Sequence, residues 1–295
     1  MIENSSIERI TANGVALNVR TSKSAGLPPL LLLHGHPQTN VIWHKVWTPL
    51  AQHFSLIAPD LRGYGDSEKP PSDASMNHAP YSKREMAKDM VALMATLGFP
   101  TFRVLAHDRG ARVTHRMMMD HPDAVSRATL LDIAPTLAMY EQTTMDFAKA
   151  YWHWFFLIQR EPLPETMIAA DPTFFIEKMM GNRHAGLSAF SPAALAEYRR
   201  CITLPGIAHA ICEDYRAAAT IDLEHDRADR DAGRKLAQPL QVLWGADGII
   251  EKCFKPLDEW QRVATDVRGG SIPCGHYIPE EAPEALLAAA LPFLI

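Results

Sequence analysis

Residues 106–110, "AHDRG", place one carboxylate between two small residues, directly after the apolar run "FRVL". Small residues two positions before and after a reactive side chain are typical of a tight strand-to-helix turn that exposes the central residue. A carboxylate can attack a saturated carbon without first losing a proton, and it forms an ester when it does so. We therefore predict that Asp108 is a nucleophile. The alternative is that Asp108 lies in a surface loop and caps the next helix.

A late histidine and an earlier aspartate could regenerate such a nucleophile. His276 stands in "CGHYIPEE" near the end of the printed sequence, and two aspartates follow apolar runs: Asp132 in "RATLLD" and Asp247 in "LWGADG". Nucleophile, acid and histidine in this chain order are typical of a site built on successive strands. The sequence favours Asp132 as the acid because it ends its run directly. The other aspartate would be a turn residue or a helix cap.

The segment "HGHPQT", residues 34–39, follows the first long apolar run. A His-Gly-x-Pro loop after a strand can present backbone N–H groups to a reacting oxygen, and the N–H after the nucleophile usually completes the pair. We predict that the N–H groups near His36 and Arg109 hold the oxyanion. The alternative is an ordinary strand-to-helix turn.

Two arginines follow the predicted nucleophile at positions 109 and 112. Residues three apart share one face of a helix, so Arg109 and Arg112 can point into one pocket. Because buried cations are costly without an anion, and a guanidinium binds a carboxylate with two hydrogen bonds, we predict that they bind a substrate carboxylate. The alternative is a structural network with Asp108 and neighbouring acids. Arg116, one turn further on, is expected to face solvent.

The elements that must position these residues alternate along the chain. Short apolar runs, typical of buried parallel strands, occur in "PPLLLLHGHPQ", "FSLIAPDLRGYG", "FRVLAHDRG", "RATLLDIAP" and "LQVLWGAD". A shorter strand is expected within "TDVRGGSIPCGHY", before Gly275 and His276. Amphipathic helices are expected at residues 86–98, at "ARVTHRMMMD" and from Pro283 onward. This alternation predicts an α/β fold with a mostly parallel, doubly wound sheet.

The alternation stops between residues 134 and 225, where helical patterns, aromatic clusters and prolines replace the apolar runs. We predict a core of residues 1–133 and 226–295 and an inserted α-helical cap of residues 134–225. Ligands of such sheets bind at the carboxyl ends of the strands, so the cap is expected to roof the pocket.

Composition narrows the class of protein further. The 295 residues are 47% hydrophobic and 21% charged, with a net charge of −5 and no long run of one sign. These values indicate a globular chain and no surface for nucleic acid or an anionic membrane. The four cysteines lie far apart without metal-ligand spacing, so we expect free thiols, no metal and no organic cofactor. With no export signal or membrane span expected, the predicted location is cytoplasmic.

Together these segments resemble the fluoroacetate (haloacetate) dehalogenases of the α/β-hydrolase superfamily. The resemblance extends over residues 32–284, and the combination of "HDRGAR" with "HW" and "CEDYRA" is its most specific part. It implies an α/β-hydrolase fold and hydrolysis of a small halocarboxylate to glycolate and halide through a covalent ester. It also implies no cofactor and a possible homodimer.

The resemblance carries over residue by residue. It implies that Asp108 is the nucleophile, His276 the base and Asp132 its acid partner, with Arg109 and Arg112 on the substrate carboxylate. In the cap it implies a halide pocket, formed by His153, Trp154 and Tyr215. One position departs from the family, because relatives commonly read "HGFPQT" where this chain has His36. A polar ring there is expected to alter the preferred halide or substrate.

Two other functions remain open from the sequence. Epoxide hydrolases share the same plan but typically use two cap tyrosines and a Trp after the nucleophile, where this chain has Arg109. The tyrosines that keep this option open are Tyr140, Tyr151, Tyr198 and Tyr215. A small-molecule binder without catalysis on the same fold is the non-enzymatic alternative.

Overall fold

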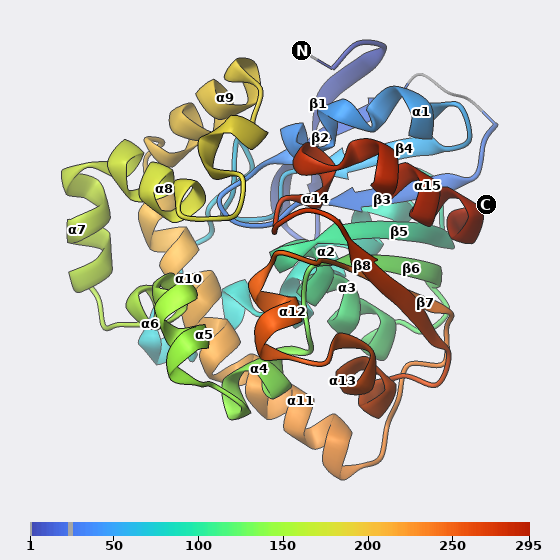
Figure 1. Cartoon of the computed structure of the whole chain (residues 1–295). Coiled ribbons are helices and arrows are strands. Elements are labelled where there is room, and N and C mark those ends of the chain that lie inside the picture. Colours follow the sequence, from blue (N-terminus) through green and yellow to red (C-terminus); the bar gives the residue numbers. More distant parts are fainter. Residues whose placement is uncertain (1, 23–25) are drawn as a thin grey trace.

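Eight strands form one sheet in the computed structural model, which describes residues 2–22 and 26–295 (Figure 1). The order across the sheet is β1-β2-β4-β3-β5-β6-β7-β8. The strands are β1 (Ser5–Ala12), β2 (Val15–Ser22), β3 (Pro29–Leu33), β4 (Ser55–Pro59), β5 (Phe102–His107), β6 (Val125–Leu131), β7 (Leu240–Gly245) and β8 (Val267–Ile272). Neighbouring strands pair in parallel from β4 to β8 in this order, whereas the pairs β1–β2 and β2–β4 are antiparallel. The predicted α/β-hydrolase fold with a mostly parallel sheet is confirmed.

The first two strands form a hairpin that is absent from the predicted elements. Asn13 and Gly14 form its turn with φ values of 50° and 75°, and Ala12 pairs with Val15. Asn-Gly between alternating apolar residues is a strong signal for such a two-residue turn, because both positions need a positive φ. The signal was therefore present in "ITANGVAL".

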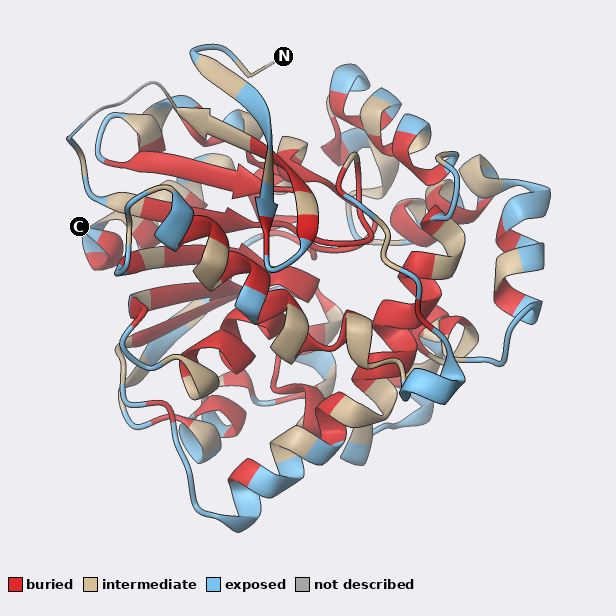
Figure 2. Ribbon diagram, turned by 180° about the vertical axis from the view of Figure 1, so that it is seen from behind, coloured by how far each residue is buried: buried red, intermediate tan, exposed pale blue. Residues whose placement is uncertain are grey.

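Helices cover both faces of the sheet, whose central strands are buried (Figure 2). Alternate residues of β3 show the division: Leu31 and Leu33 pack with one cluster, and Leu30 and Leu32 with the other. The first cluster includes side chains of α2 (Lys83–Thr96), α3 (Asp108–Asp120) and α13 (Pro256–Val263). The second includes side chains of α1 (Trp47–Ala51), α14 (Ile278–Glu281) and α15 (Pro283–Leu294). Burial on both faces explains why these strands read as continuous apolar runs.

Between β6 and β7 the chain is helical. The α-helices are α4 (Thr136–Glu141), α5 (Met145–Ala150), α6 (Trp152–Leu157), α7 (Leu163–Ala170), α8 (Pro172–Gly181), α9 (Pro192–Ile202), α10 (Ile207–Ala219) and α11 (Ile221–Asp231). Helices α6 to α9 lie beside one end of the sheet (Figure 1). Residue 225, the predicted end of the cap, lies within α11, and the division into core and cap domains stays a prediction. Among the described residues, no helix has both the length and the apolar character that a membrane crossing requires.

Candidate active site

Asp108 lies at the turn where β5 ends and α3 begins. Its φ is +45°, a left-handed conformation that costs a side-chain-bearing residue roughly 1–2 kcal/mol. Close packing explains the small residue two positions on: a Cβ on Gly110 would lie 2.6 Å from the backbone oxygen of His34, and the Gly110 N–H donates to that same oxygen at 2.9 Å. The strained turn therefore depends on glycine and holds the Asp108 side chain beyond the end of the sheet.

The loop of residues 34–39 contacts the Asp108 carboxylate directly. The backbone N–H of His36 donates to Asp108 Oδ1 at 3.1 Å. A Cβ on Gly35 would lie 2.4 Å from Asp108 Cβ, so only glycine permits this approach. The ring of His34 fixes the loop by accepting the Leu61 N–H at its Nε2, 3.0 Å away. The predicted oxyanion donor thus lies against the predicted nucleophile, and its role in the reaction stays a prediction.

His276 lies between Asp132 and Asp108. Its Nδ1 is 2.5 Å from Asp132 Oδ2, and its Nε2 is 4.0 Å from Asp108 Oδ2. Asp132 directly follows β6, and its other oxygen accepts the Gly245 N–H at 2.9 Å. A hydrogen bond from Nδ1–H to Asp132 leaves Nε2 free to accept a proton beside Asp108.

The second acid candidate, Asp247, lies apart from this group. Its side chain is 53% exposed and lies 3.8 Å from His184 Nε2 at the surface. Its backbone N–H donates to the carbonyl of Cys274 in a turn. Of the two aspartates that the sequence offers as the acid partner of the histidine, only Asp132 contacts His276.

Burial shifts the pKa of both members of the His276–Asp132 pair. It lowers the pKa of His276 to about 3, an effect to which the nearby guanidinium of Arg183 adds. It raises the pKa of Asp132 to about 7, against the opposing hydrogen bond from Gly245. Both shifts have the same cause, because each charged form loses its hydration inside the protein. The imidazole is therefore neutral near pH 7 and can accept a proton.

The charged groups around Asp108 lower the pKa of its carboxyl, whereas the pKa of Asp132 is raised. Burial alone would raise the pKa of its carboxyl, but surrounding groups hold that pKa well below its usual range; these are His276, His107, Arg112 and Arg109. Among them, the arginines are positively charged at every pH at which the protein is folded. Asp108 is therefore a carboxylate, the form that a nucleophile needs.

Arg109 forms an ion pair with a cap residue that the sequence did not indicate. Its Nε and Nη2 donate to the two carboxylate oxygens of Asp214 at 2.7 and 2.8 Å, and both side chains are fully buried. The guanidinium carbon lies 4.1 Å from the centre of the Tyr215 ring, and Nη1 has no hydrogen-bond partner among the described residues. Arg109 thus takes part in a structural network, with Asp214 as its ion-pair partner, and keeps one donor free.

Asp214 is shared by several groups from different parts of the chain. Besides Arg109, it accepts hydrogen bonds from Lys83 of α2 and from the Tyr64 hydroxyl, the latter at 2.6 Å. Asp214 lies on α10, so this network ties α10 to α2 and α3. A signal existed in the sequence: a buried Arg109 needs a counter-ion, and Asp214 stands next to Tyr215 in "CEDYRA".

Arg112 is buried without a carboxylate partner in the part of the chain that the structure describes. Its Nη1 donates to Thr136 Oγ1 at 2.9 Å and to the Ala134 carbonyl at 3.2 Å, both neutral acceptors. Its guanidinium carbon lies 4.7 Å from the Trp154 ring centre, and its Nε has no partner among the described residues. Burial lowers the pKa of this guanidinium, although Asp108 opposes the shift. Apart from the charge of Asp108 itself, this buried cation has no negative partner among the described residues, which suits an anionic ligand.

The expectation that Arg116 faces solvent is wrong. Its side chain is 3% exposed, and it forms ion pairs at 2.7 Å with Asp226 and at 2.6 Å with Asp229. Both aspartates belong to α11. The sequence pattern of α3 alone could not indicate that an acidic helix from the cap region packs across this face.

The predicted halide-pocket residues lie close to one another in the cap. His153 and Trp154 come from α6 and Tyr215 from α10, and all three are buried. The Tyr215 ring centre lies 6.0 Å from that of His153 and 6.4 Å from that of Trp154. His153 Nδ1 and Trp154 Nε1 have no hydrogen-bond partners among the described residues. These two nitrogen atoms are therefore available to bind a ligand.

His36, the position that departs from the family, lies in the same cluster. Its ring stacks with that of His153 at 6.5 Å and meets the Tyr215 ring edge-on at 5.5 Å. The side chain is 4% exposed, and neither ring nitrogen has a partner among the described residues. Burial lowers the pKa of His36 to about 3, so the ring is neutral and offers one N–H donor.

Glu280 joins the core loop to the cap behind this site. It accepts hydrogen bonds from Gln38 Nε2 at 2.5 Å and from the Tyr198 hydroxyl of α9 at 3.3 Å. Because the Tyr198 hydroxyl already donates to Glu280, it is a poor proton donor for a substrate. Burial raises the pKa of Glu280 to about 8, far above its ordinary value.

Replacing Glu280 by Gln is expected to change how stability depends on pH. Between about pH 4.5 and 8 the folded state keeps the Glu280 proton and the unfolded state loses it, so this group lowers the unfolding free energy as pH rises. The effect amounts to a few kcal/mol at most, on the order of 1.4 kcal/mol per pKa unit. An amide does not titrate, so the variant should lose less stability from pH 5 to 8 in denaturant unfolding. Parallel curves for wild type and variant would contradict this.

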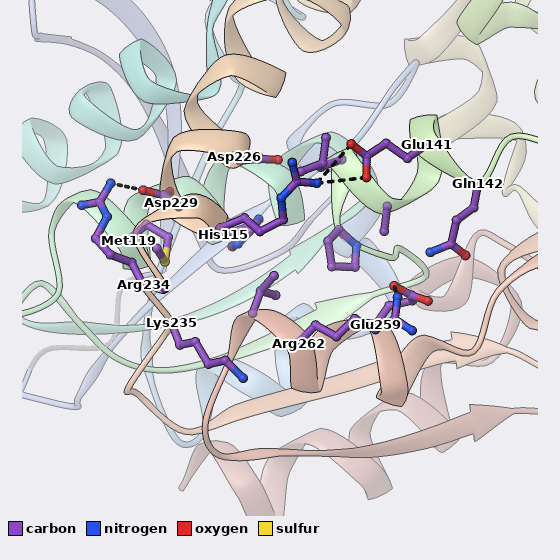
Figure 3. A pocket seen from close by; sticks show the side chains of 16 residues that line it. His115, Met119, Glu141, Gln142, Asp226, Asp229, Arg234, Lys235, Glu259 and Arg262 are labelled. Carbon is purple, nitrogen blue, oxygen red and sulfur yellow. Dashed lines mark hydrogen bonds and ion pairs between the residues drawn. The ribbon is translucent and has the colours of Figure 1, made fainter.

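A separate pocket of about 290 Å³ lies between α3, α4, α11 and α13 (Figure 3). Most of its charged groups form ion pairs, such as Arg230 with Glu141 at 3.1 Å and Arg234 with Asp229. Neither Asp108 nor His276 lines it. It is therefore distinct from the site where the reactive groups meet.

Comparison with known proteins shows the family to which the chain belongs. Residues 28–283 match the family described as alpha/beta hydrolase fold. The chain is 43% identical over 258 residues to a fluoroacetate dehalogenase from Burkholderia sp, covering 87% of this chain and 84% of that protein. It is 33% identical to a soluble epoxide hydrolase from Corynebacterium sp. (strain C12), covering 95% and 94%. The crystal structure of an alpha/beta hydrolase from Nostoc sp PCC 7120 has a TM-score of 0.94 at 49% identity, covering 100% and 99%. The chain is therefore a hydrolase that belongs to the alpha/beta hydrolase fold family.

Proposed function

We propose that the chain hydrolyses haloacetates, such as fluoroacetate or chloroacetate, to glycolate and halide. One observation carries this proposal: the guanidinium of Arg112 is buried beside Asp108 and has no carboxylate partner among the described residues. Together with the free Nη1 of Arg109, it offers two cationic donors next to the nucleophile. A small substrate with a carboxylate beside the attacked carbon fits this arrangement, whereas a neutral substrate offers these donors no negative partner.

In the first step, an oxygen of the Asp108 carboxylate attacks the α-carbon of the haloacetate. The new carbon–oxygen bond forms as the carbon–halogen bond breaks, and the halide leaves with the bonding electron pair. His153, Trp154 and Tyr215 are proposed to receive it through ring N–H and hydroxyl donors. Because fluoride is strongly hydrated in water, several donors are needed to replace its hydration shell.

In the second step, water hydrolyses the ester on Asp108. His276 takes a proton from water through Nε2, and the resulting hydroxide attacks the ester carbonyl. The backbone N–H groups of His36 and Arg109 stabilise the oxyanion of the tetrahedral intermediate. When the ester bond breaks, the glycolate oxygen takes the proton from His276. The new carboxyl group of Asp108 then loses its proton, so the reaction releases one halide and one proton for each water consumed.

A halide-release assay tests the proposal. Fluoride and chloride are measured during incubation with fluoroacetate and chloroacetate, and an Asp108→Asn variant serves as the blank. The proposal predicts catalytic release of at least one halide by the wild-type protein. Release no faster than in the variant with both substrates would refute it.

Replacing Arg112 by Leu is expected to raise KM for chloroacetate by about 10- to 100-fold, corresponding to roughly 1.4–2.7 kcal/mol of lost binding. The reason is the loss of a charged partner for the substrate carboxylate. Steady-state kinetics with chloroacetate and with neutral chloroacetamide measure the effect. Arg112→Lys should recover part of the loss, since it keeps the charge but not the planar fork. An unchanged kcat/KM for chloroacetate in Arg112→Leu would contradict the carboxylate-binding role.

Epoxide hydrolysis is the second candidate function. One structural feature favours it: the Tyr140 hydroxyl has no partner among the described residues, and its ring centre lies 5.0 Å from that of Trp154. A tyrosine hydroxyl there could protonate an opening epoxide ring. The positively charged arginines beside Asp108 favour the halocarboxylate. Comparing kcat/KM for styrene oxide and chloroacetate distinguishes the two functions.

A further inference from the structure

A third cation, Arg183, lies on the open side of the catalytic histidine. It follows the end of α8 and lines a cavity of about 370 Å³ that His276 also lines. The guanidinium carbon is 4.3 Å from the ring centre of Tyr151, so an aromatic face holds it in position. Arg183 is thus fixed where the cavity meets the reactive groups.

The lining of this cavity is predominantly positive. Lys149, Lys252 and Arg183 contribute three cations, and Asp247 is the one carboxylate in the lining, where it lies near His184. In the described ranges 2–22 and 26–295, Arg183 forms no ion pair, in contrast to Arg109 and its carboxylate partner. A cleft lined by one sign of charge concentrates ligands of the opposite sign.

The charge of Arg183 also acts on the groups of the proposed reaction. It contributes to the lowered pKa of His276 and of His153, in both cases second to burial. Burial acts to lower the pKa of Arg183, but Tyr151 and, to a smaller extent, Asp108 outweigh it and raise that pKa. These interactions place the guanidinium within electrostatic reach of both the nucleophile and the base.

We propose that this cavity is the entrance for the substrate and that Arg183 is a specificity-determining residue that draws small carboxylates through it to Asp108. This inference rests on the proposed haloacetate hydrolysis. The anion first meets Arg183 and then moves to the free donors of Arg109 and Arg112. Neutral molecules of the same size gain nothing from this path, so Arg183 selects for charge before the reaction begins.

The test compares Arg183→Gln with the wild type on chloroacetate and on neutral chloroacetamide. At low salt, kcat/KM for chloroacetate should fall about 10- to 100-fold, because electrostatic steering contributes on the order of 10–1000-fold to association. The kcat/KM for chloroacetamide should change less than about 2-fold, a difference that loss of folding could not produce. The wild-type decrease in kcat/KM for chloroacetate with rising salt should become weaker in the variant, since salt screens this attraction.

Two further variants control the result. Arg183→Lys should restore most of the activity because it keeps the charge. Lys178→Gln, which removes an exposed cation of α8 that lies over the Phe174 ring, should match the wild type with both substrates. The acid limb of the pH profile for Arg183→Gln should also shift to higher pH, because a cation near His276 is lost.

The outcomes separate this inference from the proposed function. Normal wild-type turnover of chloroacetate with equal kinetics for Arg183→Gln would overturn the role of Arg183 alone. An equal loss on chloroacetate and chloroacetamide would also overturn it, because the effect would not depend on substrate charge. Absence of halide release by the wild type from any haloacetate would instead refute the proposed function.

Discussion

Replacing His276 by Asn is expected to stop the reaction after its first step and to leave an ester on Asp108. The nucleophile remains intact, so halide should still be released once per protein molecule. Hydrolysis of the ester then lacks its base, and steady-state turnover should fall by about 100- to 10,000-fold. Mass spectrometry after incubation with chloroacetate should find the peptide that contains Asp108 heavier by one carboxymethyl group.

The position of His276 between Asp108 and Asp132 is the basis of this prediction. His276 Nε2 lies 4.0 Å from Asp108 Oδ2, and its Nδ1 is held by Asp132 at 2.5 Å. The control is the double variant that also carries Asp108→Asn, which should give neither a halide burst nor a modified peptide. An unmodified Asp108 peptide in His276→Asn, together with continued halide release, would refute the assignment of nucleophile and base.

Replacing Asp214 by Asn is expected to lower the unfolding free energy by about 3–5 kcal/mol. The carboxylate of Asp214 faces two buried cations, Arg109 and Lys83, and is itself fully buried. An amide of nearly the same shape leaves Arg109 without a negative partner and Lys83 with only Asp222, at 4.0 Å, in a region of low dielectric. Denaturant unfolding at constant pH measures the change, and activity should fall too because Arg109 loses its orientation.

An exposed ion pair provides the matched control. Asp66 pairs with Arg200 at 2.6 Å, and both side chains are 43% exposed. Asp66→Asn should therefore change the unfolding free energy by less than about 1 kcal/mol. If both variants lost the same stability, the buried network around Asp214 would not have the proposed importance.

The central strands and the turn at Asp108 could be predicted because their signals are local. The run "FRVLAH" followed by "DRG" specifies a buried strand, a tight turn and a helix start, and Gly110 meets the close approach of the His34 backbone. The hairpin of β1 and β2 had an equally local Asn-Gly signal. Its strands alternate apolar and polar residues, so they lack the continuous apolar runs that mark the central strands.

The environment of the arginines could not be predicted in the same way. Residues 109 and 112 share one helical face in the sequence pattern, and residue 116 follows one turn further on, yet the three have different surroundings. Arg109 pairs with Asp214, Arg112 faces neutral acceptors, and Arg116 pairs with aspartates of α11. The partners of Arg109 and Arg116 lie more than 100 residues away in the chain, whereas those of Arg112 are 22 and 24 residues away. No local pattern specifies which of these segments will pack together.

The sequence by itself determined the parallel α/β sheet, the position of Asp108 on a strained turn and the chain order of acid and histidine. These features follow from hydrophobic patterning and from residues that act on their immediate neighbours. Only the tertiary structure decided that Asp132 rather than Asp247 contacts His276, that Asp214 neutralises Arg109, and that Arg183 lies beside the open side of the site. The physical reason is that burial and long-range charge pairing exist only once separate helices and strands have packed together.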